Sequence, residues 1–328
     1  MYNETMYERG NAPSAIRELF AYGMERKAQI GEDKVFDFSI GNPSVPAPDS
    51  VAETIRELAD MAPAQLHAYS AAQGLESTRA AIAENLNKRF DTHYTADNLY
   101  LTMGAAACLS ACFTALIKPG DEIIVIAPYF PEYRIWIEFA GGVCVEVPAR
   151  EDNFQIDFDA LEQAITEKTK AVVINTPNNP VGTVYTRETL EGLADVLVQA
   201  EQRFGHDIYL ISDEPYRELT YGVEVPWVPA IYPNTLVCYS WSKSLSLPGD
   251  RIGYVLVPNE VHDSREVYLA VCGAGRSLGY ICAPVFFQRV IERCVDEPTN
   301  VEAYTVNREI LTHALDELGY EYIEPDGA

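Results

Sequence analysis

Residues 171–216 read AVVINTPNNPVGTVYTRETLEGLADVLVQAEQRFGHDIYLISDEPY. Two short apolar runs, Ala171–Asn175 and Ile208–Ser212, flank a longer amphipathic stretch, Arg187–Arg203. The runs have the length and composition of buried strands, and the stretch between them has the periodicity of a helix. A strand, a crossover helix and a second strand place both strands parallel in one sheet. This segment therefore predicts a parallel α/β fold.

The same alternation continues on both sides of this unit. Further strands are predicted at Asp121–Ala127, Thr235–Ser240 and Tyr254–Val257. Helices are predicted at Val51–Met61, Gly74–Phe90, Ala105–Ile117, Pro131–Phe139 and Phe158–Glu167, and helical sequence runs from about Arg289 to Leu318. The fold class that follows is α/β, with a mostly parallel sheet between two layers of helices.

The chain divides into three parts in this interpretation. Residues 1–48 form an N-terminal arm and the lead-in to a small domain, and their last part is rich in Pro, Gly and Ser. Residues 49–289 hold the predicted strands and form the large domain. Residues 290–328 supply a helix and at most one strand, at Gly319–Ile323, which is too little for a second core. They are predicted to begin a small α/β domain that is incomplete.

The composition is that of a globular protein with an acidic surface. Hydrophobic residues make up 48% and charged residues 22%, and 24 basic against 49 acidic residues give a net charge of −25. This charge repels phosphate backbones and anionic lipid, so neither nucleic acid nor membrane is an expected partner. The seven cysteines form no CxxC pair and do not cluster with the five histidines. We therefore expect no metal site and a reducing, cytoplasmic location.

A lysine and an arginine follow the predicted strand at Thr235–Ser240. Lys243 lies in the sequence SWSK, and Arg251 comes eight residues later, after a Pro-Gly turn. A lysine amine is protonated near neutral pH and becomes a nucleophile when it is desolvated or bound as an imine. The planar guanidinium group of arginine binds phosphate through two hydrogen bonds. A solvated lysine and arginine in a serine-rich loop would have the same local sequence.

Three more motifs lie at predicted strand ends or helix starts: NTPNNPVGT at Asn175–Thr183, SDEPY at Ser212–Tyr216 and TMGAAA at Thr102–Ala107. Alone, the first is compatible with a plain turn and the second with a helix cap. The third allows a phosphate to approach free N–H groups at a helix start, or a helix to pack closely on the sheet. Because ligands of such sheets bind beyond the carboxyl ends of the strands, the motifs together indicate one site.

In these motifs the chain resembles the fold-type I pyridoxal-phosphate aminotransferases of the aspartate aminotransferase class. The most specific match is SxSKxxxxPGxRxGY at Ser240–Tyr254. Further matches are PNNPxG at Pro177–Gly182, DEPY at Asp213–Tyr216, HAY at His67–Tyr69 and PYFPEY at Pro128–Tyr133, and the resemblance spans nearly the whole chain. It implies the fold of the pyridoxal-phosphate-dependent transferases. It also implies transfer of an amino group between an L-amino acid and a 2-oxo acid, with pyridoxal 5′-phosphate as cofactor.

The resemblance also implies roles for single residues around the cofactor ring. Lys243 would form the internal aldimine and then move the substrate's α-proton. Asp213 would pair with the pyridine nitrogen, and Tyr216 and Asn179 would hydrogen-bond the phenolic oxygen. Tyr129 would stack on the ring face. The catalytic residues are therefore predicted to be Lys243, Asp213 and Tyr216.

Phosphate and substrate contacts follow from the same resemblance. The phosphate would be bound by Gly104, Ala105, Ala106, Ser240, Ser242 and Arg251, and by Tyr69 of a neighbouring subunit. The substrate would contact Gly41, Asn179 and Tyr129. A tyrosine that reaches into the neighbouring site implies a homodimer with shared active sites.

Several alternatives stay open at this point. Relatives continue past the PDGA sequence and carry the arginine for the substrate α-carboxylate there, so we expect either a fragment or another source of this contact. Aspartate, aromatic amino acids and alanine are all compatible as donors. A β-lyase or decarboxylase of the same fold, and a pyridoxal-phosphate-binding domain without catalysis, are the competing interpretations.

Overall fold

The computed structural model describes residues 2–12 and 15–328. The chain separates into two compact units, one up to Ser44 and one from Val45 onward. The first unit contains helices α1 (Glu4–Asn11) and α2 (Ala15–Ile30) and the short 3-10 helix η1 (Glu32–Lys34). Gly41 belongs to this first unit, and all the other predicted site residues belong to the second.

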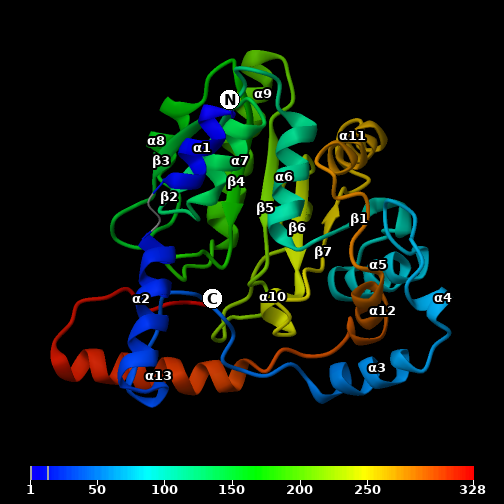
Figure 1. Cartoon of the computed structure of the whole chain (residues 1–328). Helices are drawn as coiled ribbons and strands as arrows, with labels where there is room; N and C mark the ends of the chain where they lie inside the picture. The colour runs from blue at the N-terminus through cyan, green and yellow to red at the C-terminus, as the bar shows by residue number, and fades with distance from the viewer. Residues whose placement is uncertain (1, 13–14) are drawn as a thin grey trace. The chain divides into compact units, whose positions relative to one another are not determined.

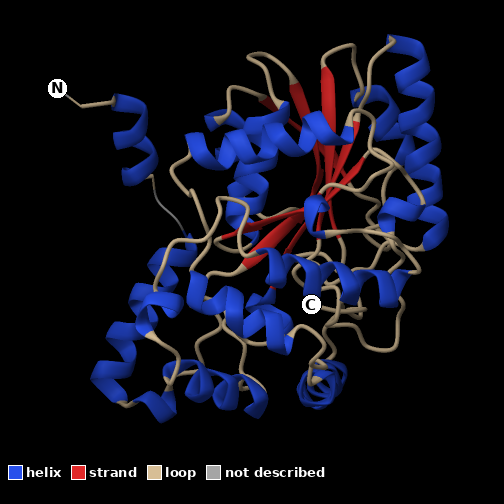
Figure 2. Cartoon of the chain, turned by 90° about the vertical axis from the view of Figure 1, so that its right-hand side faces the viewer, coloured by secondary structure: helices blue, strands red, loops and turns tan. Residues whose placement is uncertain are grey.

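The second unit is built on one sheet, which Figures 1 and 2 show between helices. The described residues form seven strands in the order β1-β7-β6-β5-β4-β2-β3. Their bounds are β1 (Leu99–Thr102), β2 (Glu122–Ala127), β3 (Val143–Pro148), β4 (Thr169–Asn175), β5 (Tyr209–Asp213), β6 (Thr235–Ser240) and β7 (Gly253–Leu256). Neighbours from β3 to β6 run parallel, and β7 is antiparallel to both β6 and β1. The predicted mostly parallel sheet is confirmed.

Helices cover both faces of this sheet. One face packs against α6 (Ala105–Leu116), α7 (Glu132–Phe139) and α11 (Ser264–Ser277). The other packs against α8 (Phe158–Ala164) and α9 (Arg187–Phe204) near β2 and β4, and against α3 (Asp49–Ala59), α5 (Glu76–Phe90) and α12 (Val285–Cys294) near β1 and β7. In β2, Ile123 and Ile124 lie in different clusters, because successive strand residues point to opposite faces. Burial on both faces explains the nearly continuous apolar strands.

The remaining elements are short or lie at the C-terminal end. They are α4 (Pro63–Leu66), η2 (Ala96–Asn98), η3 (Val228–Ala230), α10 (Trp241–Ser244) and α13 (Val301–Leu318). The helical sequence expected up to Leu318 is thus two helices, with Pro298 in the break between them. A proline cannot continue a helix from its interior, which explains the interruption. No helix in the described ranges combines the length and apolar character that crossing a membrane requires.

Two strands and several helices were not predicted, and one expected strand is not formed. The unpredicted elements are the strands β1 and β3 and the α-helices α1, α2, α4, α10 and α11. β3 is an edge strand whose residues are mostly half-buried or exposed, so it lacks the apolar run of a central strand. Residues 319–323 form no strand; near the end of the chain, Gly327 makes a single bridge with Thr220.

Candidate active site

The four motifs lie along one edge of the sheet. Asn175 and Asp213 are registered neighbours at the ends of β4 and β5. At the end of β6, Ser240 is opposite Gly253 of β7, which is opposite Thr102 of β1 on its other side. Strand pairing therefore brings motifs that are far apart in the chain to one edge of the sheet.

Asp213 is a buried carboxylate at the centre of this edge. Asp213 is only 5% exposed. Its Oδ2 accepts a hydrogen bond from the hydroxyl of Tyr133 on α7, at 2.5 Å. Oδ1 is buried and has no hydrogen-bond partner among the described residues. Burial raises the pKa of this carboxyl to about 7; the bond from Tyr133 opposes the rise and the charge of Glu214 adds to it. A cationic N–H partner would satisfy the oxygen and lower this pKa.

Two asparagines connect Asp213 to a tyrosine. Asn175 Nδ2 donates to the backbone oxygen of Asp213 at 2.8 Å, and its Oδ1 accepts the N–H of Asn179 at 2.6 Å. Asn179 Nδ2 in turn donates to the hydroxyl oxygen of Tyr216 at 3.3 Å. Burial, together with the charge of Asp213, raises the pKa of Tyr216 to about 12. The hydroxyl therefore keeps its proton at neutral pH and is available as a donor.

Lys243 lies above the ring of Tyr216. It is carried by α10, a single turn that begins directly after β6. Its Nζ is 5.7 Å from the centroid of the Tyr216 ring, and the side chain is half-buried. Burial lowers the pKa of Lys243 from its ordinary value. A larger share of the amine is then neutral and nucleophilic.

A cradle of small residues and one arginine lies next to this lysine. Helix α6 begins after Gly104, whose φ of +84° suits glycine. A Cβ at Gly104 would lie 2.7 Å from Nη2 of Arg251 and one at Gly253 would lie 3.0 Å from the Cα of Gly104, so only glycine allows both approaches. Arg251 Nη2 also donates to the backbone oxygen of Met103 at 3.2 Å. The arginine is thereby held against the start of α6.

This cradle has the properties of an anion site. The first N–H groups of a helix, here those of Ala105 and Ala106, have no acceptor within the helix and carry partial positive charge. On the neighbouring strand, Ser240 Oγ donates to Ser242 Oγ at 3.2 Å. Free backbone donors, hydroxyls and a guanidinium group together suit a phosphate.

Comparison with known proteins agrees with this geometry. A family model described as "Aminotransferase class I and II" matches residues 33–328. The chain belongs to the class I and II aminotransferases. The crystal structure of an aminotransferase from Eubacterium rectale is similar with a TM-score of 0.97 and 56% sequence identity, over 100% of this chain and 83% of that one.

Two further relatives carry more specific names. An aspartate/prephenate aminotransferase of Thermus thermophilus is 32% identical over 320 residues, which is 96% of this chain and 80% of the relative. The structure of aspartate aminotransferase from Thermus thermophilus with maleate has a TM-score of 0.85 at 30% identity, and covers 100% of this chain and 84% of that chain. The aminotransferase is thus a pyridoxal-phosphate-dependent transferase of fold type I that acts on amino acids and 2-oxo acids. These relatives do not favour a β-lyase or a decarboxylase.

The residues at the sheet edge fit pyridoxal phosphate in two independent places. The unpartnered Oδ1 of Asp213 can accept a hydrogen bond from a protonated ring nitrogen. The cradle around Gly104 and Arg251 can hold the phosphate. A series of contacts leads from Asp213 through Asn179 and Tyr216 to Lys243. The side chains of Asn179 and Tyr216 can therefore bind the ring oxygen.

The other predicted residues lie in different surroundings. The hydroxyl of Tyr129 donates to Glu146 on β3, and its ring is nearly parallel to that of Tyr133 at 6.2 Å between centroids. Tyr69 is 93% exposed. Gly41 lies in the first compact unit, so its contact with substrate stays a prediction.

Two residues that make hydrogen bonds within the site, Tyr133 and Asn175, were given no role from the sequence. They occur in the motifs PYFPEY and NTPNNP. Tyr133 binds a carboxylate 80 positions later in the chain. No local pattern reveals such a contact, because it depends on how α7 packs on the sheet.

Proposed function

We propose that Lys243 binds pyridoxal phosphate covalently and moves the α-proton of an amino-acid substrate, with Asp213 as the partner of the ring nitrogen. One observation carries this proposal: a buried carboxylate oxygen of Asp213, without a partner among the described residues, lies on the same sheet edge as a desolvated lysine. The oxygens of a structural ion pair are satisfied within the chain, whereas this oxygen is open to a ligand.

Each residue has a distinct task in this proposal. The bound cofactor supplies an aldehyde that reacts with amines and a ring that accepts the electron pair from the substrate's α-carbon. Asp213 keeps the proton on the ring nitrogen, and the adjacent cation keeps its own carboxyl ionised although burial favours the neutral form. Once the amine of the substrate has displaced Lys243 from the cofactor, the neutral amine of Lys243 would take the proton from the α-carbon and later return it.

The remaining residues bind and orient. The hydroxyl of Tyr216 and the amide of Asn179 donate to the ring oxygen, where they stabilise negative charge. The phosphate is held by Gly104, Ala105, Ala106, Ser240, Ser242 and Arg251. Tyr129 covers the ring face, and Asn179, Tyr129 and Gly41 contact the substrate.

Replacement of the lysine tests the covalent step. The full chain is incubated with pyridoxal phosphate, reduced with borohydride and digested, and the peptide that contains Lys243 is weighed. We expect a cofactor-sized mass increase in the wild type and none in Lys243→Ala. Turnover of that variant should fall by about 10²- to 10⁴-fold, the range a general acid or base contributes.

Lys170 provides a matched control. It is also about half-buried, its pKa is also lowered by burial, and its Nζ lies 4.8 Å from the centroid of the Tyr209 ring. It stands near the opposite end of its strand, at the start of β4. Lys170→Ala should keep both the mass increase and the turnover; normal turnover in Lys243→Ala would refute the proposal.

The donor is proposed from the printed names of relatives. Several are called aspartate aminotransferases, including one from Thermotoga maritima that is 32% identical over 304 residues. Another is an aromatic-amino-acid aminotransferase of Thermococcus litoralis. We propose aspartate as the preferred donor. The absorbance of the cofactor-loaded chain should change most steeply with added aspartate when aspartate, glutamate, alanine and aromatic amino acids are compared.

We also propose a homodimer that acts in the cytoplasm. The exposed ring of Tyr69 is available to a second subunit, and the molar mass in solution tests this assembly. All seven cysteines are free thiols, although Sγ atoms of Cys112 and Cys238 are 3.7 Å apart. This is compatible with a reducing compartment. The proposed domain limits stay at residues 1–48, 49–289 and 290–328.

A further inference from the structure

The helix that carries Lys243 is too short to be stable by itself. α10 contains only residues Trp241–Ser244, and its N-cap Ser240 makes no capping bond through its side chain. An isolated helical turn is unstable in water, because one hydrogen bond does not offset the ordering of several residues. The position of the Lys243 amine therefore depends on contacts between α10 and the rest of the protein.

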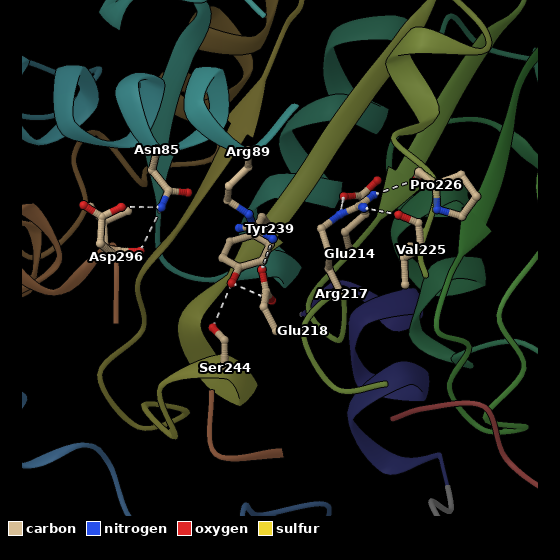
Figure 3. A network of polar contacts seen from close by, with 11 residues as sticks. Asn85, Arg89, Glu214, Arg217, Glu218, Val225, Pro226, Tyr239, Ser244 and Asp296 are labelled. Carbon is tan, nitrogen blue, oxygen red and sulfur yellow. Dashed lines mark hydrogen bonds and ion pairs between the residues drawn. The ribbon is translucent and has the colours of Figure 1, made fainter. Parts of the chain in front are cut away.

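Ser244 makes such a contact from a different side of α10 than Lys243. Its hydroxyl lies 2.8 Å from the hydroxyl of Tyr239 on β6, and both residues are buried (Figure 3). Successive residues of a helix point about 100° apart, so Lys243 and Ser244 cannot face the same surroundings. The lysine lies over the ring of Tyr216, and the serine is bound to Tyr239.

The contact continues to a carboxylate and a guanidinium group. Tyr239 donates its hydroxyl proton to Glu218 Oε2 at 2.9 Å, and Arg89 Nη2 on α5 donates to Glu218 Oε1 at 2.9 Å. Burial, and then the charge of Glu218, raise the pKa of Tyr239 well above its usual range. Since the single proton of Tyr239 goes to Glu218, Ser244 must be the donor toward Tyr239.

We infer that Arg89, Glu218, Tyr239 and Ser244 form an anchoring chain of hydrogen bonds. This chain positions the amine of Lys243 by restraining α10 at Ser244. The inference rests on the proposed role of Lys243 and adds four positioning residues to it. In the described part of the chain, the side chains of these four residues make no hydrogen bond to a group assigned to the ring or the phosphate. Their effect is exerted through the orientation of α10.

The surroundings of the chain explain why hydrogen bonds are needed there. A cavity of about 240 Å³ borders α10, and its lining includes Arg89, Glu218, Tyr239, Ser244 and Tyr254. Side chains that border such a space lack packing partners on one side. Directional bonds to Ser244 therefore add to the packing of the buried Trp241 and Leu245 in restraining α10.

The cavity also supplies a matched control. Tyr254 of β7 is the registered neighbour of Tyr239, and their rings are 5.2 Å apart and nearly parallel. The two residues are 5% and 4% exposed, but only the hydroxyl of Tyr239 is bonded to α10 within the described part of the chain. Tyr239→Phe and Tyr254→Phe therefore make the same chemical change in nearly the same place.

Two readouts test the inference in the full chain. The first is kcat and KM with aspartate. The second, which needs no substrate, is the rate at which added pyridoxal phosphate becomes attached to Lys243, followed by absorbance as a function of pH. Only the neutral amine attacks, so the midpoint of this rate profile reports how strongly Lys243 is desolvated.

We expect Tyr239→Phe and Ser244→Ala to lower kcat about tenfold, with a smaller change in KM, as misplacement of a reacting group does. The midpoint of the attachment profile should move to higher pH, because a loosened α10 lets the amine reach water. Tyr254→Phe should match the wild type in both readouts. Ser244→Thr, which keeps a hydroxyl and has the cavity to receive its methyl group, should be close to the wild type.

The outcomes separate this inference from the function it rests on. Equal kcat and equal midpoints in Tyr239→Phe and Tyr254→Phe would overturn the anchoring chain while the role of Lys243 stands. The same holds if Ser244→Ala behaves as the wild type, which covers the case of a poorly folded Tyr239→Phe. Attachment at a residue other than Lys243 in the wild type would overturn both.

Discussion

Asp213 and Glu214 are adjacent carboxylates, both buried, in opposite electrostatic environments. Glu214 is 1% exposed, and its Oε2 accepts from Arg217 Nε at 2.5 Å (Figure 3). Its Oε1 accepts from the hydroxyl of Ser212 at 2.7 Å. Asp213 has the hydroxyl of Tyr133 on one oxygen and no partner on the other among the described residues. One acid is paired with a cation of its own chain, and the other is not.

The two acids meet different parts of the molecule. Asp213 contacts Tyr133 in the cluster under α7, whereas Glu214 contacts Arg217, whose guanidinium lies 5.3 Å from the Phe90 ring centroid and 5.1 Å from that of Trp227. Neighbouring residues at a strand end point to opposite sides of the sheet. A buried charge with a partner in its own chain is compensated in the folded state, and removing that partner is costly. A buried acid left without such a partner is a candidate for binding a ligand.

Removing the carboxylate of Asp213 should have the largest effect and tests whether the two acids differ in function. Asp213→Ala should retain bound pyridoxal phosphate through the phosphate cradle and lose turnover by about 10⁴-fold, because the ring no longer holds its proton. Without cofactor, its unfolding free energy at pH 8 should equal or exceed that of the wild type. Steady-state kinetics and urea unfolding measure the two effects. Turnover within tenfold of the wild type would reject Asp213 as the nitrogen partner.

The pH dependence of stability distinguishes the acids next. The folded, cofactor-free chain holds a proton on Asp213 up to about pH 7, whereas the unfolded chain releases it near the ordinary pKa of 3.8. The folded state therefore binds more protons in this window, and its stability falls as the pH rises from 4 to 7. The loss is on the order of 4 kcal/mol at ~1.4 kcal/mol per pH unit. The measurement is urea unfolding at several pH values for the wild type and Asp213→Asn, and equal slopes would contradict the prediction.

Glu214 should show the complementary pattern. Glu214→Gln leaves the guanidinium of Arg217 buried without its anion, which costs about 3 kcal/mol of unfolding free energy. The properly folded fraction should keep kcat within about threefold of the wild type, because Glu214 is bonded to Arg217 and Ser212 rather than to the site. Replacing both partners by apolar residues, Glu214→Leu with Arg217→Met, should recover most of the loss. A Glu214→Gln variant as stable as the wild type would contradict this prediction.

The central part of the fold was predictable because its signal is local. Five strands were expected in the large domain and all five are present, and Thr235–Ser240 has the same bounds in the structure. Strands buried on both faces produce continuous apolar runs, which stand out against the helices between them. β1 and β3 were missed because β1 has only four residues and β3 lies at the edge with little burial.

The sequence by itself determined the alternation of strands and helices, the motifs that follow the strands, and the residue types available for chemistry. These properties depend on residues close together in the chain. The tertiary structure decided which of two adjacent acids is left without a cation, that Tyr133 binds Asp213, and that Arg89 and Glu218 reach α10 through Tyr239. Such facts depend on packing between distant segments, since the energy of a buried charge is set by whatever lies within a few ångströms of it.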